Sequence, residues 1–337
     1  MHVIRQAGPA DYDALMDLAR ASGPGFTSLP EDEPTLRKRL EISDASFTEA
    51  LPATDRWYVL MMEDTDTGEI DGLAGVKAAV GLKRPFISFR RMNFSHYHVS
   101  EDAGSHRVDQ PALMFVNECK GWTEVGSLFL KPEKRVGGSG ALLSRSRYML
   151  IGARPELFNE WVLAELRGVF DANGHSPFWE HVTSKFFGMD FESADELSGK
   201  GDGQFIFDLA PHHPLYESLM HPDARAAIGQ VFSEGVPAKK LLEREGFRAI
   251  GLVDVFDAGP TMASQRDAIR TVREARVMAA RVVKDVEGDP HLLSTTTLNG
   301  FRAVRAVAEP VSNGIEISEE AADALKVRDG DPIRAIA

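Results

Sequence analysis

EVGSLFLKPEKRVGGSGALLSRSRYML, residues 124–150, is the segment of this 337-residue chain that decides its fold. Its apolar run at 125–130 predicts a strand, and a helix is expected to begin near Ala141. Between the two lies a loop rich in glycine, whose missing side chain lets backbone amides approach a ligand closely. Because a helix N-terminus also carries partial positive charge, the segment predicts a loop that binds a pyrophosphate through its backbone.

The loop contains the pattern Arg135-Val-Gly-Gly138-Ser-Gly140. It is neither a Walker A loop nor a dinucleotide fingerprint, since Gly-Lys-Ser/Thr and the spacing Gly-x-Gly-x-x-Gly are both absent. The pattern Arg-x-x-Gly-x-Gly resembles the acyl-CoA-binding loop of the GNAT-like acyl-CoA N-acyltransferase superfamily, in which loop amides hold the pyrophosphate of CoA. The resemblance implies acyl-CoA contacts at the strand end and along the loop, namely Leu128, Phe129, Leu130, Arg135, Val136, Gly137, Gly138, Ser139, Gly140 and Ala141.

Composition and charge limit the possible functions. The chain has 38 Lys and Arg against 51 Asp and Glu, a net charge of -13, which argues against nucleic-acid or anionic-membrane partners and permits a basic substrate. The single cysteine, Cys119, excludes an internal disulfide and a cysteine-rich zinc site, so no metal is expected. No signal peptide begins the sequence, and no apolar run approaches the roughly 20 residues that span a bilayer. We therefore expect a cytoplasmic protein.

The order of the expected elements favours the same superfamily. Strands and helices are expected, in order, as a strand at 2–5, helices at 9–22 and 31–40, and a strand hairpin at 57–62 and 72–80. Between this hairpin and the glycine-loop segment, residues 86–109 are expected to form a polar loop. Its histidines, His96, His98 and His106, lack a metal-ligand spacing.

A further strand is expected at 161–168, and it carries two charges. Side chains alternate along a strand, so Glu165 and Arg167 share one face. One interpretation is an ion pair at a sheet edge. The other is recognition of a zwitterionic ligand, with Arg167 binding a carboxylate and Glu165 an amine or guanidinium.

The second half of the chain repeats a helix-to-strand pattern at 176–191 and again at 237–256, which predicts a tandem α+β fold. Its mixed sheet would be flanked by helices, with GNAT-like units at 1–203 and 204–285 and a small, structural β-rich appendage at 286–337. Asp254 and Asp257 are expected on opposite faces of the last strand of this pattern. The basic stretch at 266–281 is expected to be helical.

Many ordered matches make the chain similar to the bacterial arginine N-succinyltransferase family. They are Thr27-Ser-Leu-Pro30, Ser127-Leu-Phe-Leu130, Leu143-Ser-Arg-Ser-Arg147, Ala164-Glu-Leu-Arg-Gly168, Ser176-Pro-Phe-Trp179, Lys185-Phe-Phe-Gly-Met-Asp-Phe191, Ile228-Gly-Gln230, Glu245-Gly-Phe247 and Asp254-Val-Phe-Asp-Ala-Gly-Pro260. The resemblance implies transfer of a succinyl group from succinyl-CoA to the α-amine of L-arginine, or of ornithine in some members. The family's succinyl-CoA contact matches Leu128, whose backbone amide would polarise the thioester carbonyl. We expect Ser28, Arg167 and Ser176 to bind substrate and Glu165 to act as the base.

One position departs from the family pattern. The family's proton-donor histidine follows Ile-Gly-Gln-Val, and here Phe232 stands there, which can neither accept nor donate a proton. This leaves open a catalytically weakened, acyl-CoA-binding subunit of a heteromeric arginine/ornithine succinyltransferase. An N-acyltransferase with another donor or amine is a third hypothesis. We expect a homo-oligomer or a hetero-oligomer with a paralogue.

Overall fold

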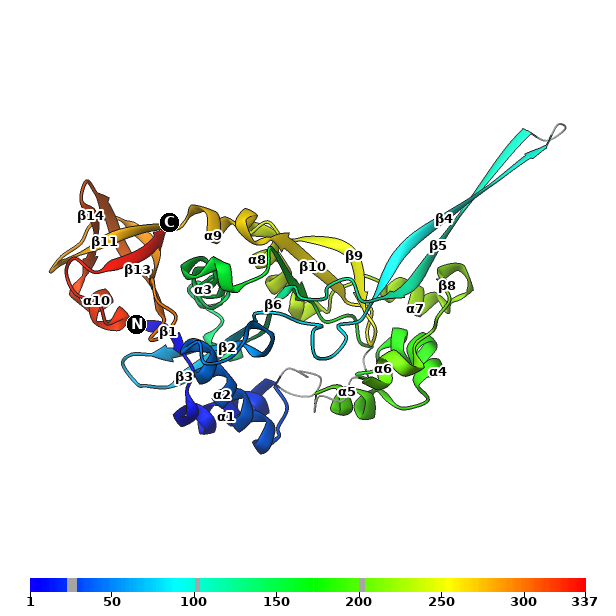
Figure 1. The fold of residues 1–337 in the computed structure, drawn as a ribbon, viewed down its shortest axis with the longest axis horizontal. Coiled ribbons are helices and arrows are strands. Elements are labelled where there is room, and N and C mark those ends of the chain that lie inside the picture. The colour runs from blue at the N-terminus through cyan, green and yellow to red at the C-terminus, as the bar shows by residue number, and fades with distance from the viewer. Residues whose placement is uncertain (23–28, 101–103, 172, 200–203) are drawn as a thin grey trace.

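The strands of this chain form one continuous sheet that links two differently built parts. The computed structural model describes residues 1–22, 29–100, 104–171, 173–199 and 204–337. Within them the strand order is β12-β15-β11-β14-β13-β1-β2-β3-β6-β7-β10-β9-β4-β5-β8 (Figure 1). The strands are β1 His2–Gln6, β2 Trp57–Asp64, β3 Ile70–Lys77, β4 Ser88–Ser100, β5 Gly104–Val116, β6 Thr123–Leu130, β7 Trp161–Glu165, β8 Leu215–Tyr216, β9 Arg248–Asp254, β10 Pro260–Gln265, β11 Arg276–Val283, β12 Asp289–Thr295, β13 Arg302–Val311, β14 Gly314–Ser318 and β15 Pro332–Ile336.

Helices cover this sheet. They are α1 Tyr12–Ser22, α2 Glu33–Phe47, α3 Ser139–Ala153, α4 Ser184–Phe187, α5 Phe191–Gly199, α6 Gln204–Leu209, α7 Pro222–Ala227, α8 Val236–Arg244, α9 Arg270–Glu274 and α10 Glu319–Leu325. A π-helical turn, η5 Trp179–Thr183, precedes α4, and short 3-10 turns are η1 Pro9–Asp11, η2 Ala53–Asp55, η3 Pro132–Lys134, η4 Pro155–Leu157, η6 Glu217–Leu219, η7 Ser233–Gly235 and η8 Arg266–Ala268. The α+β class expected from the sequence is confirmed.

Alternation along β2 builds two cores on opposite faces of the sheet. Leu60 and Met62 pack in the core that contains α3, while Val59 and Met61 pack in the core that contains α1 and α2. Because successive side chains of a strand point to opposite faces, one strand serves both layers. Each fully buried side chain of this size contributes about 1.5–3 kcal/mol. The central sheet is therefore fixed between helices, with α3 directly behind the glycine loop.

The last part of the chain closes into a small barrel. β12 pairs with both β15 and β13, and β11 pairs with β14 and β15, so five strands form a ring without a free edge. Its interior holds Leu293, Val304, Ile317 and Ile333. β13 also pairs with β1, which joins the barrel to the central sheet. The predicted C-terminal β-rich region is confirmed, while the boundaries at 203 and 285 and the tandem repeat remain predictions.

Three of the elements expected from the sequence differ in the structure. Most of the expected loop at 86–109 is strand, because β4 and β5 form a long hairpin that extends away from the rest of the molecule (Figure 1). The strand expected by Phe191 is absent, since α5 begins there. The helix expected at 266–281 is limited to α9, and Arg276–Val283 is strand β11, whose β-branched residues suit a sheet.

The structure describes no helix that is long and apolar enough to cross a membrane.

Candidate active site

The strands β6 and β7 part at the centre of the sheet. They are parallel and pair only at Thr123–Val162 and Glu124–Leu163. Beyond these pairs β6 continues beside β3, while β7 continues beside β10. Backbone groups of the second half of β6 are therefore free of a β7 partner, as expected for strands that admit a ligand between them.

An irregularity in β6 lies at the predicted thioester contact. Leu73 pairs with Phe129 and Gly75 with Gly126, so the register shifts across Ser127 and Leu128. Ser127 has φ 48°, which is uncommon for a residue other than glycine. A bulge of this kind turns backbone groups away from regular strand pairing. The register shift thus leaves Ser127 and Leu128 outside the regular residue pairs of β6 with β3.

The glycine loop follows directly. Gly137 and Gly138 have φ 62° and 89°, a left-handed conformation that favours glycine. Gly138 caps α3, and its carbonyl accepts hydrogen bonds from the amides of Ala141 and Leu142, both at 3.0 Å. The helix begins at Ser139, two residues before the expected start, so the first-turn amides belong to the loop. Arg135 Nε donates to Leu130 O at 3.0 Å and ties the loop to the strand end.

Glu165 ends β7 on the other side of the parted strands. No described residue forms a hydrogen bond or ion pair with its carboxylate, so the predicted ion pair with Arg167 is absent. Burial raises the pKa of Glu165 well above its usual 4.5, and the nearby carboxylates of Asp254 and Glu124 raise it further. Lys77 opposes this shift, but its ammonium lies 2.7 Å from Glu124. Glu165 is consequently a carboxyl group with a raised proton affinity, which makes it a candidate for proton transfer.

Asp254 and Asp257 surround Glu165, which the sequence reasoning missed. It expected them on opposite faces of one strand, but β9 ends at Asp254 and Asp257 lies in the turn that follows. The two oxygens of Asp257 accept the amides of Gly168 and Gly259, each at 2.8 Å. Burial raises the pKa of Asp257, and these hydrogen bonds oppose the shift. The repeated Asp and Gly of Asp254–Pro260 were the only signal of such a turn.

Arg167 lies two residues beyond the end of β7. Its guanidinium stacks on the ring of Phe170 at 4.1 Å and lies 5.5 Å from the ring centre of Phe232. The amide of Phe232 donates to the carbonyl of Arg167 at 2.9 Å. The position at which this chain departs from the family pattern is therefore in contact with the predicted carboxylate-binding residue.

Of the two serines predicted to bind substrate, the structure describes only Ser176. Ser28 lies outside the described residues. Ser176 is buried, and its hydroxyl accepts the amide of Trp179 at 3.2 Å, as a cap of the helical turn does. A role of either serine in substrate binding remains a prediction.

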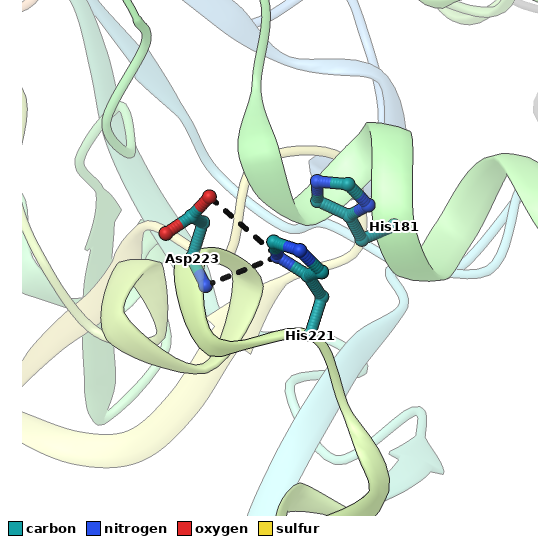
Figure 2. Close-up of side chains that lie close together, drawn as sticks. All are labelled: His181, His221 and Asp223. Atoms are coloured by element: carbon teal, nitrogen blue, oxygen red, sulfur yellow. Dashed lines mark hydrogen bonds and ion pairs between the residues drawn. The ribbon is translucent and has the colours of Figure 1, made fainter.

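A cluster of possible cation ligands lies apart from these groups. His181 in η5, His221 and Asp223 offer ligand atoms within 4.8 Å of one another, and all three side chains are exposed (Figure 2). The two imidazoles stack with their centres 3.9 Å apart, and His221 Nδ1 accepts the amide of Asp223 at 3.3 Å. The partners of His221 within this cluster are therefore His181 and Asp223.

Comparisons with known proteins show which family the chain resembles. Residues 2–271 match the model of the arginine N-succinyltransferase beta subunit, and residues 273–337 match the C-terminal domain of that subunit. Arginine N-succinyltransferases of Salmonella schwarzengrund and Salmonella arizonae are 39% and 38% identical to the chain over 338 residues, covering 100% of it and 97% of each relative.

A solved structure is similar over its whole length. Subunit AI of the arginine/ornithine succinyltransferase of Pseudomonas aeruginosa is 31% identical, with a TM-score of 0.90, covering 100% of this chain and 98% of that one. The chain belongs to the arginine N-succinyltransferase family.

Proposed function

We propose that this chain transfers a succinyl group from succinyl-CoA to the α-amine of L-arginine. The observation that carries the proposal is the parting of β6 and β7 between a glycine loop and the half-buried carboxylate of Glu165, which has no hydrogen-bond or ion-pair partner among the described residues. One side of the parted strands provides backbone amides for a CoA ester, and the other provides a group that takes a proton from an amine. Membership of the family supports both halves.

The donor side works through its backbone. The strand end and loop, residues 128–130 and 135–141, would hold the thioester and the pyrophosphate of succinyl-CoA. The Leu128 amide would donate to the thioester carbonyl and stabilise the negative charge that develops on its oxygen. Backbone donors of this kind are fixed before the reaction, so no reorganisation is needed during it.

The acceptor side works through side chains. The guanidinium of Arg167 would bind the arginine carboxylate, and Ser28 and Ser176 remain proposed contacts of the substrate. Glu165 would take the proton of the α-ammonium, after which the amine nitrogen attacks the thioester carbon. A carbon–nitrogen bond then forms, the carbon–sulfur bond breaks, and CoA leaves as a thiolate that takes up a proton.

An assay of free thiol tests the proposal directly. The purified full chain is mixed with succinyl-CoA and arginine, ornithine or lysine, and mass spectrometry identifies the product. We expect CoA release with arginine and a product heavier by one succinyl group, with less release when acetyl-CoA is the donor. Absence of release with every amine would refute the proposal, and a faster reaction with another donor or amine would reassign the substrate.

Phe232 favours one alternative, a subunit that binds acyl-CoA but needs a paralogous partner for full activity. The matching family model and the similar Pseudomonas protein are both named as subunits. The test is Phe232→His: a silent parent chain and an active variant would support the alternative. Full activity of the parent chain alone would eliminate it.

The proposed function sets the expected surroundings of the chain. Its partners would be succinyl-CoA, arginine, and either further copies of itself or a paralogue, in the cytoplasm. Light scattering of the purified chain, alone and with CoA, measures the assembly directly.

A further inference from the structure

The C-terminal barrel reaches the glycine loop. A cavity of about 360 Å³ is lined on one side by loop and helix residues Gly137, Gly138, Ser139 and Leu142, and on the other by His2 of β1 and by Pro290, Arg305, Ala306 and Val307 of β12 and β13. Helix α3 also packs against β12 and β13. The wall facing the loop therefore comes from a separate part of the chain, which the sequence analysis expected to be only structural.

Arg305 is the charged side chain of that wall closest to the loop. Its Nη1 donates to the carbonyl of Gly137 at 3.0 Å. A Cβ atom on Gly138 would lie only 2.7 Å from the same nitrogen, so the guanidinium lies directly over the loop. Within the described part of the chain, no carboxylate forms an ion pair with Arg305. Since a guanidinium has five N–H donors, most of them remain for an anion.

The neighbouring strand adds a second polar group. Val3 faces Val304 in the antiparallel pair of β1 and β13, so the next residues outward are His2 and Arg305. The ring of His2 is held in place, with Nε2 3.0 Å from the buried carboxylate of Asp71. Lys134, which precedes the loop, lies 3.2 Å from the same carboxylate. The cavity is thus lined by Arg305, by the ring of His2 and by the positive end of α3, while Lys134 lies beside Asp71 outside the lining.

We propose that Arg305 binds a phosphate group of the acyl-CoA at the glycine loop, so that the C-terminal barrel is part of the donor site. The inference rests on the proposed function, because it assigns a residue to the same ligand. A bidentate guanidinium suits a phosphate, which a loop of amides alone holds less strongly. Two phosphate sources share this chemistry, the diphosphate and the 3′-phosphate of CoA.

Steady-state kinetics of full-length variants test the assignment. Arg305→Ala is expected to raise the KM for succinyl-CoA by on the order of tenfold, with kcat and the KM for arginine changed less than about twofold. Arg305→Lys should recover part of the loss, since it restores charge but not the fork. The matched control is Arg276→Ala, an exposed arginine on β11 of the same barrel that does not line the cavity.

Shortened donors identify the phosphate. With succinyl-dephospho-CoA, which lacks the 3′-phosphate, a persisting penalty of Arg305→Ala assigns the diphosphate, and a vanished penalty assigns the 3′-phosphate. With S-succinyl-pantetheine, which lacks both, the penalty must vanish. An equal KM for variant and parent, or a penalty that persists with S-succinyl-pantetheine, would overturn the proposal.

Calorimetry with CoA separates this inference from the proposed function. If the parent chain binds CoA and Arg305→Ala binds it equally well, only the role of Arg305 fails. If the parent chain neither binds CoA nor releases it from succinyl-CoA, the proposed function and the role of Arg305 both fail. Thermal melts of the variants confirm that a change in affinity is not a loss of fold.

Discussion

The two sides of the parted strands differ in the groups that they present to a ligand, backbone amides on one side and side chains on the other. The proposed donor side is one continuous segment from β6 through the glycine loop, and its proposed contacts are mainly backbone amides. The proposed acceptor side combines Glu165, Arg167, Asp254 and Asp257, side chains from segments about 90 residues apart in the sequence. The difference predicts that backbone changes on one side alter donor binding, and that side-chain changes on the other alter chemistry or acceptor binding.

Glu165→Gln is expected to cause the largest effect. Removing a general base lowers kcat by roughly 10²–10⁴-fold, while the KM for succinyl-CoA should remain near its parent value because the donor side is untouched. In the parent chain the base form appears only above the raised pKa of Glu165, so kcat should rise with pH through that range. The variant should lack this rise, and kcat–pH profiles of both proteins measure it.

Glu160→Gln is the control, an exposed carboxyl group one residue before β7. Its profile should match that of the parent chain. If Glu165→Gln retained full kcat and the same pH profile, Glu165 would not be the base. The proton transfer would then no longer be assigned to this side of the parted strands.

Arg167→Lys should mainly change acceptor binding. A lysine keeps the charge but cannot form two parallel hydrogen bonds to a carboxylate, and it stacks less well on Phe170. We expect the KM for arginine to rise by roughly ten- to thirtyfold, with the KM for succinyl-CoA unchanged. Arg37→Lys is the control, since Arg37 stacks on Tyr12 at 3.8 Å in another part of the molecule. A rise in the KM for succinyl-CoA alone would contradict the assignment of Arg167 to binding of the arginine carboxylate.

Gly138→Ala should mainly change donor binding. At φ 89° a side chain strains the backbone, and its Cβ would meet Arg305 at 2.7 Å. The KM for succinyl-CoA should rise about tenfold while the KM for arginine stays constant. Gly330→Ala is a matched control, because Gly330 has φ 88° and open space around its Cβ position. If Gly138→Ala, like the control, changed stability but not the KM for succinyl-CoA, the loop would not be a ligand site.

The contrast between one contiguous segment and residues far apart in the sequence also explains which parts of the site could be predicted from the sequence. The strand, loop and helix of the donor side follow each other directly, so local patterns predicted them, and the structure moves the helix start by only two residues. Asp254 and Asp257 come close to Glu165 only because β10 pairs with both β7 and β9. Local sequence patterns do not predict pairing between strands that lie far apart in the sequence. Arg305 reaches the loop through strand pairing as well.

The hairpin of β4 and β5 shows a different limit. Its outer residues are exposed on both faces, including Tyr97 at 66% and Val99 at 76%, so no apolar alternation marks them as strands. The polar composition that predicted a loop describes their exposure correctly. It is silent about backbone pairing, which runs from Ser88–Val116 to Ser100–Gly104.

The smallest effect concerns stability, and it again separates the two sides. In the unfolded chain Glu165 ionises near pH 4.5, whereas in the folded protein burial and nearby carboxylates delay ionisation to higher pH. Between these values the unfolded state binds fewer protons, so the free energy of unfolding falls as pH rises, and the loss persists above the folded pKa. Glu165→Gln cannot ionise and should escape this loss.

Urea unfolding at several pH values measures the difference. Below about pH 4 the variant and the parent chain should be equally stable, and at pH 8 the variant should be the more stable, by about 1.4 kcal/mol if the folded pKa lies one unit above its usual value. Gly138→Ala should instead lose stability by the same amount at every pH, since it changes backbone strain and no charge. If the stability of Glu165→Gln and that of the parent chain depended on pH in the same way, the pKa of Glu165 would be the same in the folded and the unfolded chain. A carboxylate with an unshifted pKa is too weak a base to deprotonate an ammonium group efficiently.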